Sequence, residues 1–187
     1  MQLTLNLEID FDTEETADSP VGTDEWYTPR HIVDRVLAFF GGEIDLDPAS
    51  NSHTNPNVPA RRVFTAKDDG LSQPWAKHSL EHGWTPQKIW CNPPYSRNQE
   101  WAKKALFEWQ AGHIEEILVL VPNKPGTQWF KNYIKMGPIM AIIEGRLKFG
   151  NATTGAKFES VLIYGGDRME DFRHHFQSVA SCFLIVN

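Results

Sequence analysis

The four residues Asn92, Pro93, Pro94 and Tyr95 follow a short apolar run at residues 89–91. Two consecutive prolines make a stiff turn without backbone N–H donors, while their carbonyl groups stay free to accept hydrogen bonds. The Asn92 side-chain oxygen is a further acceptor, and Tyr95 adds a flat aromatic face. Together they predict a pocket for a planar group bearing an NH₂, with its nitrogen lone pair turned toward an electrophile. Taken alone, the same residues are also compatible with an ordinary turn between a strand and a helix.

Hydrophobic periodicity predicts the elements that must position this turn. Short apolar runs predict strands at residues 43–47, 63–65, 89–91, 117–121, 139–143, 160–164 and 182–186. Apolar residues at helical spacing predict helices at residues 29–40, 98–110, 127–136 and 168–178, the first with Thr28 as its N-cap. Strands that alternate with helices favour an α/β fold with a largely parallel sheet. Ligands of such sheets bind beyond the carboxyl ends of the strands, which is where Asn92 stands.

The N-terminal part of the chain differs from the rest. In residues 1–11 apolar and polar side chains alternate, which predicts a strand, either at the edge of the main sheet or in a contact between subunits. Residues 12–24 are acidic and predict a linker. We therefore predict an extension at residues 1–23 and a folded domain at residues 24–187. Residues 1–22 hold six acids and no base, whereas the remainder balances 18 acids against 18 bases, so the net charge of −6 neither indicates nor excludes nucleic-acid binding.

The composition is that of a soluble globular protein, with 187 residues of which 41% are hydrophobic and 22% charged. No apolar run approaches the roughly 18 residues of a membrane span, and the N-terminus lacks the pattern of a secretory signal. Cys91 and Cys182 are too few for a disulfide framework, which favours a reducing cytoplasm. His78 and His82 stand four residues apart, but a zinc site needs three or four ligands in a better pattern, so no metal site is predicted.

The Asn-Pro-Pro-Tyr sequence is similar to a motif of amino-group methyltransferases that use S-adenosylmethionine. Further segments of the chain extend this resemblance in order and spacing. They are Glu25-Trp26-Tyr27-Thr28-Pro29, residues 44–50 (IDLDPAS), Asp68-Asp69-Gly70-Leu71 followed by Trp75, and Gly145-Arg146-Leu147-Lys148-Phe149. Together, over residues 24–166, they resemble the phage DNA N-6-adenine methyltransferase family, the small Dam-type enzymes. One segment departs from most enzymes that use this cofactor, because the loop DPASNSHTNP contains no glycine.

The resemblance implies a single Rossmann-like class I methyltransferase domain, with a mixed, mostly parallel sheet and helices on both faces. It implies transfer of a methyl group from S-adenosylmethionine to N6 of adenine in double-stranded DNA, by an enzyme of phage or prophage origin in the bacterial cytoplasm. The base must leave the duplex to reach the pocket. The predicted catalytic residues are Asn92 and Pro93, which would hold the N6 hydrogens, with Pro94 and Tyr95, of which Tyr95 would stack on the base.

Residues of the other matching segments are predicted to bind the cofactor. Asp47 ends a predicted strand and can attract the cationic methionine end, and Asp45 shares its face two residues earlier. Asp68 or Asp69 can accept a hydrogen bond from the cofactor's adenine or ribose. Thr28 and Pro29 bring a helix N-terminus close to the carboxylate. The full predicted set is Trp26, Tyr27, Thr28, Pro29, Asp45, Asp47, Pro48, Asp68 and Asp69.

Basic residues are predicted to contact DNA phosphates. They are Arg61, Arg62, Lys124, Arg146 and Lys148. Because the chain is too short for a large recognition domain, the loops at residues 51–62, 72–87 and 150–157 are expected to read the target. The Dam-type resemblance makes GATC a candidate target.

Two alternatives stay open at this point. Asn-Pro-Pro-Tyr is also used to methylate a glutamine amide in translation release factors and amino groups of RNA bases, but those enzymes usually carry the glycine-rich loop. A second alternative is a nucleic-acid-binding relative that keeps the fold without turnover. The absent glycine loop favours it, whereas the intact motif at residues 92–95 argues against it.

Overall fold

The computed structural model describes residues 24, 26–75 and 88–186. The predicted strand at residues 1–11, the acidic segment up to residue 23, and His78 and His82 lie outside the described residues. No helix within the described ranges combines the length and the apolar content that a membrane span requires.

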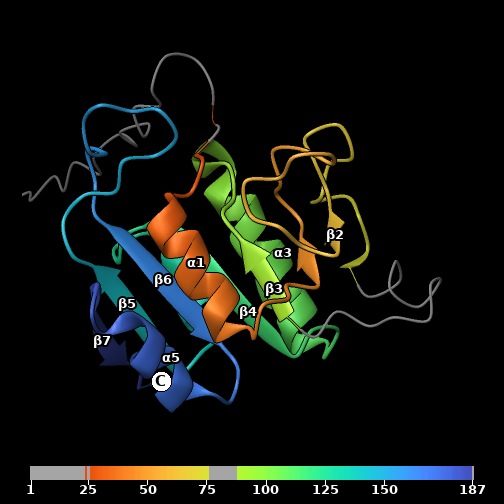
Figure 1. Ribbon diagram of the computed structural model, residues 1–187. Coiled ribbons are helices and arrows are strands. Elements are labelled where there is room, and N and C mark those ends of the chain that lie inside the picture. The colour runs from red at the N-terminus through yellow and green to blue at the C-terminus, as the bar shows by residue number, and fades with distance from the viewer. Residues whose placement is uncertain (1–23, 25, 76–87, 187) are drawn as a thin grey trace, which may run out of the picture.

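One sheet of seven strands forms the centre of the described structure (Figure 1). The strands stand in the spatial order β2-β1-β3-β4-β6-β5-β7. Their bounds are β1 Leu46–Asp47, β2 Arg62–Val63, β3 Lys88–Cys91, β4 Glu116–Pro122, β5 Ile139–Ile143, β6 Ser160–Gly165 and β7 Ala180–Leu184. Each strand predicted within the described residues is therefore present, although β1 and β2 are shorter than the apolar runs suggest.

The directions of the strands correct one prediction. β2, β1, β3 and β4 pair in parallel, whereas β6 is antiparallel to β4 and to β5, and β7 is antiparallel to β5. Half of the ladders are thus antiparallel, and they hold most of the paired residues, so the prediction of a mostly parallel sheet is wrong. The physical reason is that β6 is buried along its whole length. A strand buried on both faces is apolar in either direction, so its composition does not reveal its pairing.

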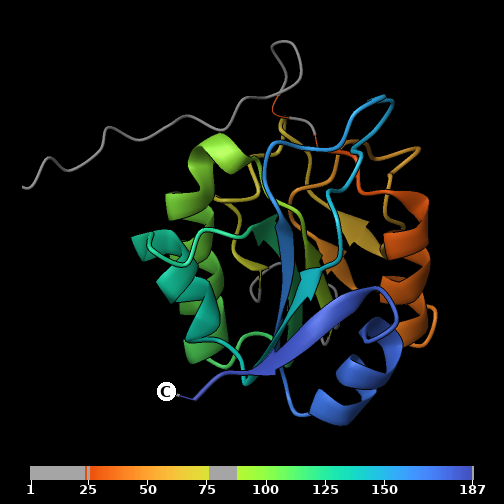
Figure 2. The same cartoon turned by 90° about the vertical axis from the view of Figure 1, so that its left-hand side faces the viewer.

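Helices cover both faces of the sheet, as expected (Figure 2). α1 (Arg30–Phe39) and α5 (Met169–Phe176) lie on one face, and α3 (Asn98–Gln110) and α4 (Gln128–Ile134) on the other. The alternation of β4 shows why two cores form. Leu118 and Leu120 pack with α1 and α5, whereas Ile117, Val119 and Val121 pack with α3 and α4. A 3₁₀ turn, η1 (Tyr95–Arg97), precedes α3.

The order of the strands creates a crevice. The chain runs from β1 to β2 on one side and then crosses to β3 on the other side of β1. At such a switch point the two connections leave in opposite directions, so the carboxyl ends of the two strands border an open cleft. Residues that follow β1 and β3 are therefore brought together.

Candidate active site

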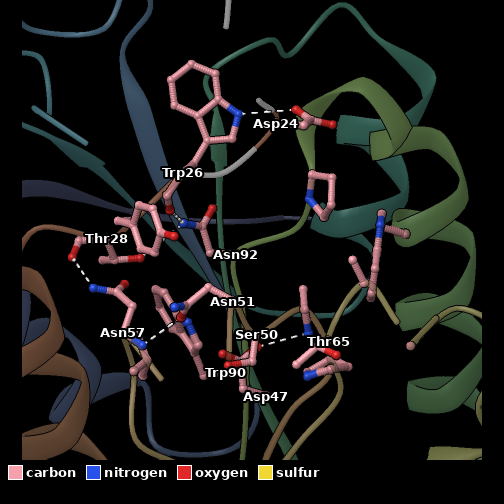
Figure 3. Close-up of a pocket in the computed structure, with 18 of the residues that line it drawn as sticks. Asp24, Trp26, Thr28, Asp47, Ser50, Asn51, Asn57, Thr65, Trp90 and Asn92 are labelled. Atoms are coloured by element: carbon pink, nitrogen blue, oxygen red, sulfur yellow. Dashed lines mark hydrogen bonds between the residues drawn. The ribbon is translucent and has the colours of Figure 1, made fainter. Parts of the chain in front are cut away.

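A pocket of about 320 Å³ lies at the carboxyl ends of β1 and β3, and Figure 3 shows its lining. This volume is at the lower end of the range for small-molecule sites. Asp47 and Asn92 both line it, which confirms that the two strand ends meet. Of the predicted set, the lining also includes Trp26, Tyr27, Thr28, Pro48, Asp69 and Pro94.

The Asn92 side chain is held by its own amide nitrogen. Nδ2 donates to the backbone carbonyl of Trp26 at 2.6 Å and to Oγ1 of Thr28 at 3.0 Å. A carbonyl oxygen can only accept, so this contact fixes which end of the amide faces Trp26. The other end, Oδ1, is buried and has no hydrogen-bond partner among the described residues. Asn92 thus brings an unused acceptor to the lining of the pocket.

Thr28 has a different local role from the one its sequence context predicts. Helix α1 begins at Arg30 with Pro29 at the N-cap, and no side chain among the described residues caps it. The Thr28 hydroxyl accepts from Asn92 instead, and its carbonyl accepts from Nδ2 of Asn57 at 3.2 Å. The prediction of Thr28 as an N-cap is wrong, because its hydroxyl oxygen accepts a hydrogen bond from Asn92 after β3 and not from the first turn of α1.

Tyr95 is buried beneath Trp26 rather than open to the pocket. The two rings stack at 5.0 Å between centroids with 23° between their planes, and only 5% of Tyr95 is exposed. Phe149 and Phe158 close the edges of this pair. Burial raises the pKa of the Tyr95 phenol well above its usual value. Trp26 is therefore the member of the stacked pair that lines the pocket.

Asp47 is a buried carboxyl with few partners. Its Oδ1 accepts from the backbone N–H of Ala49 at 3.0 Å. Removal from water disfavours the charged form, and burial raises the pKa of Asp47 to about 7, partly offset by this hydrogen bond. The buried thiol of Cys91 lies near enough for the Asp47 charge to add to the rise of its own pKa. A cation bound in the pocket would stabilise the charged form of Asp47 and so offset the free-energy cost of burying its carboxylate.

Two of the other three predicted cofactor carboxylates, Asp45 and Asp68, are engaged elsewhere. Oδ2 of Asp45 accepts from the backbone N–H of Lys88 at 3.0 Å, and Asp45 does not line the pocket. Oδ2 of Asp68 accepts from the Thr65 backbone N–H and hydroxyl, both at 2.7 Å, and these bonds lower the pKa of Asp68. Asp69 lines the pocket instead. Pro29 and Pro93 also lie outside the lining.

The glycine-free loop after β1 keeps its shape through asparagine side chains. Oδ1 of Asn51 accepts from the Asn57 backbone N–H at 2.7 Å, which closes the loop on itself. The close approach that a glycine usually permits is found instead at Gly70. A Cβ there would lie 2.0 Å from the Pro48 carbonyl oxygen, so only glycine fits against this loop. Gly70 thus lets the segment after β2 pack directly against the loop that follows β1.

The chain is similar in sequence to known proteins over the segments that form the pocket. The family model for DNA N-6-adenine-methyltransferase (Dam) matches residues 15–162. The chain belongs to this family. A DNA N-6-adenine-methyltransferase of Escherichia phage T1 is 29% identical over 107 residues, which are 57% of this chain and 39% of that protein. A DNA N-6-adenine-methyltransferase of Haemophilus phage HP1 (strain HP1c1) is 24% identical over 133 residues, 71% of this chain and 69% of that protein.

The match thus spans well under half of the phage T1 relative and about two thirds of the phage HP1 relative. Membership of the Dam family confirms the predicted resemblance. The matched residues include the whole pocket lining, from Asp24 to Trp101.

Sequence reasoning missed several pocket residues of this Dam-family chain, among them Asp24, Arg97 and Trp101. Asp24 lies in the segment predicted as a linker, Arg97 was not singled out, and Trp101 belongs to the helix predicted at residues 98–110. From α3, Trp101 packs in the core and also lines the pocket. Acidic residues within a linker carry no periodic signal, so Asp24 could only be found from its contacts.

The predicted DNA-contacting residues lie outside the pocket lining. Arg146 and Lys148 are exposed on the loop between β5 and β6, where Leu147 and Phe149 between and beside them are buried. The backbone N–H of Gly150 donates to the Tyr27 carbonyl at 2.9 Å, which ties this loop to the pocket wall. Arg61 pairs with Glu43 at 2.6 Å, Arg62 lies in β2 and Lys124 in the turn after β4. Across the described residues, no three His, Cys, Asp or Glu side chains gather as metal ligands would.

Proposed function

We propose that this chain transfers the methyl group of S-adenosylmethionine to the N6 amino group of adenine in double-stranded DNA. One observation carries the proposal: Asn92 brings a buried oxygen without a partner to the pocket, held in place by its own amide nitrogen. A buried acceptor without a donor is costly unless a ligand satisfies it. An exocyclic amine supplies the donor that is missing, and the family membership favours adenine N6.

The fold supports a Rossmann-like class I methyltransferase domain. The pocket lies at the switch point between β1 and β3, where open α/β sheets bind their ligands. The residues fit the cofactor in charge and polarity. We assign Asp47 to the cationic methionine end and Asp69 to the ribose or adenine, because both line the pocket whereas Asp68 is bonded to its own turn. Pro48 and Tyr27 complete the walls.

The residues of the chain position the reacting groups. The cofactor supplies a methyl group already activated by the positive sulfur. Asn92 Oδ1 would accept one N6 hydrogen. The carbonyl of Pro93, which stands outside the lining but between the lining residues Asn92 and Pro94, would accept the other, and together they would direct the nitrogen lone pair toward that methyl group. Positioning of this kind supplies much of the rate in a direct in-line transfer. A base stacked within a duplex cannot enter such a pocket, so we propose that it is flipped out.

The aromatic pair forms the wall against which the flipped base would lie. Tyr95 was predicted to stack on the base, and Trp26 covers one of its faces in the structure. We therefore assign stacking to the pair, with Trp26 turned to the pocket and Tyr95 supporting it. Pro94 lines the same wall.

We assign the remaining functions by their place around the pocket. Arg146 and Lys148 stand on a loop tied to Tyr27, where they would meet DNA phosphates near the flipped base. Residues 24–187 would form the methyltransferase domain and residues 1–23 an extension of it. The two phage relatives favour phage or prophage origin and action in the host cytoplasm.

Transfer of a labelled methyl group tests the proposal directly. The chain is incubated with methyl-labelled S-adenosylmethionine and unmethylated duplex DNA, RNA or a release factor, and the product is digested to its units. We expect label in N6-methyladenine from duplex DNA, and none from DNA that is already methylated at the same sites. Label in RNA or in a glutamine amide, or no label in any acceptor, would contradict the proposal.

A further inference from the structure

Asp24 makes an unusual number of contacts for a residue in a segment without regular structure. Oδ1 accepts from the Trp26 indole N–H at 3.4 Å and from the Tyr95 backbone N–H at 3.1 Å. The backbone N–H and the hydroxyl of Ser96 also donate to its carboxylate. The Asp24 carboxylate therefore joins the start of the described chain to the turn that follows β3.

A second set of bonds joins the same two segments in the opposite sense. Asn92, which precedes that turn, donates to the Trp26 carbonyl and to the Thr28 hydroxyl. The segment at residues 24–28 and the turn after β3 are thus joined twice. The Asp24 carboxylate accepts hydrogen bonds from the turn, and the Asn92 amide donates hydrogen bonds to the segment. Trp26 belongs to both sets, since its indole donates to Asp24 and its carbonyl accepts from Asn92.

We propose that Asp24 is a positioning residue for methyl transfer, which holds the Trp26 carbonyl so that Asn92 presents its oxygen and not its NH₂ to the substrate amine. This inference rests on the proposed function. The two ends of an amide have nearly the same shape, so only its hydrogen-bond partners decide which end faces the pocket. If the Trp26 carbonyl moves away, the amide can rotate. It then offers a donor to an amine that needs an acceptor.

Kinetics of Asp24 variants give the first test. We expect Asp24→Ala to lower kcat by about 10²-fold, the scale of a misplaced reacting group, while KM for S-adenosylmethionine changes by about twofold or less. Asp24→Asn should keep intermediate activity, because its one carbonyl oxygen can still accept from Tyr95. Asp34→Ala is the matched control, since Asp34 is a half-exposed aspartate on α1 that pairs with Arg30 at 2.7 Å. It should behave as the unmodified chain does.

A second readout does not depend on activity. The side-chain NH₂ signal of Asn92 can be assigned in ¹⁵N spectra by its loss in Asn92→Ala. We expect this signal to exchange slowly with solvent in the unmodified chain and in Asp34→Ala. It should exchange like that of an exposed asparagine in Asp24→Ala. Where Asp24→Ala fails to fold, Asp24→Asn decides through the same signal.

The outcomes separate the two proposals. Slow exchange in Asp24→Ala would overturn the positioning role, and so would a loss of kcat matched by an equal loss of cofactor affinity, which indicates general damage to the pocket. A chain that methylates no acceptor contradicts the proposed function alone, because the exchange of the Asn92 amide still tests what Asp24 holds in place.

Discussion

The amino and carboxyl ends of the central strands differ in how the buried polar side chains there are hydrogen-bonded. At the amino end, Glu116 receives two hydrogen bonds from Arg168, both at 2.7 Å, and Arg168 also donates to the Phe39 carbonyl at 3.0 Å. Asp45 accepts there from the Lys88 backbone N–H. At the carboxyl end, Asn92 keeps a buried oxygen without a described partner. Glu116 and Asp45 thus have hydrogen-bond partners at the amino end, whereas the Asn92 oxygen at the carboxyl end has none among the described residues.

We interpret this contrast as a difference between polar groups that stabilise the fold, such as Glu116 and Asp45, and a polar group proposed to bind a ligand, Asn92. Native proteins pair nearly all buried polar atoms, so an exception asks for an explanation. Because Asn92 lines the pocket, our proposal assigns its unpaired oxygen to a ligand, and local rules of folding are expected to fail at such sites. Variants at the carboxyl end should therefore change turnover, and variants at the amino end should change stability.

The largest effect is expected from Asn92→Ala. Loss of one acceptor aimed at the reacting group should lower turnover by about 10³-fold, while the cofactor still binds. The matched control is Asn132→Ala, which removes a buried asparagine of α4 whose Oδ1 accepts from Gln128 at 3.2 Å. It should cost about 1 kcal/mol of stability and leave turnover unchanged. Equal turnover in the two variants would erase the contrast between the ends.

Asp47 should make cofactor binding depend on pH. Burial raises its pKa from 3.8 to about 7, so between these values the folded chain holds a proton that the unfolded chain has lost. Folding stability without cofactor should therefore fall as pH rises from about 4 to about 7, by about 1.4 kcal/mol for each unit of pKa separation. The cationic cofactor favours the carboxylate, so its affinity should rise over the same window.

Asp47→Asn should remove both trends, because the amide does not titrate. Thermal unfolding and cofactor dissociation constants, each measured from about pH 5 to about pH 8, check this. Asp45→Asn is the control at the other end of β1. Unchanged pH slopes in Asp47→Asn would show that another group carries them.

The sequence is informative where chemistry and periodicity coincide. Asn92 and Asp47 could be placed at neighbouring strand ends because each follows a short apolar run, and the structure brings both to one pocket. The helices α1, α3, α4 and α5 follow equally from the spacing of apolar residues, whereas their place on both faces was implied by the family resemblance. The direction of β6 could not be predicted, because an apolar run buried on both faces looks the same in either direction.

The site residues that sequence reasoning missed depend on contacts over long separations. Asp24 meets Tyr95 and Ser96 across some seventy residues, and no local pattern marks a carboxylate for that role. Asp45 and Asp47 illustrate the same limit, since both are acidic and close to β1, and only the distance to Lys88 shows that Asp45 is already bonded. Types and spacing nominate residues, whereas partners decide their roles.

A moderate effect on stability is expected at the amino end. Arg168→Ala leaves Glu116, whose side chain is 18% exposed, without its paired charge, and it removes the guanidinium that lies 4.4 Å from the Phe39 ring centroid. Because Arg168 is itself 34% exposed, we expect a loss of about 1–2 kcal/mol in denaturant unfolding. Arg173→Ala breaks an exposed pair with Glu170 and should cost about 0.5 kcal/mol or less. Turnover at low temperature, where both variants stay folded, should not change in either variant. A fall in the turnover of Arg168→Ala under those conditions would place Arg168 in the site.

The smallest effect tests whether an unpaired atom matters outside the pocket. The Tyr133 hydroxyl is buried in the core beneath α4 and has no partner among the described residues, like Asn92 Oδ1, but Tyr133 does not line the pocket. Because this hydroxyl is buried away from the pocket lining, Tyr133→Phe removes a polar atom that has no described partner in the folded chain. We expect unchanged turnover and stability equal to or up to about 1 kcal/mol above that of the unmodified chain, measured by denaturant unfolding. If Tyr133→Phe instead loses turnover, an unpaired buried atom outside the pocket affects catalysis too. The position of the Asn92 oxygen in the pocket would then not be what sets it apart.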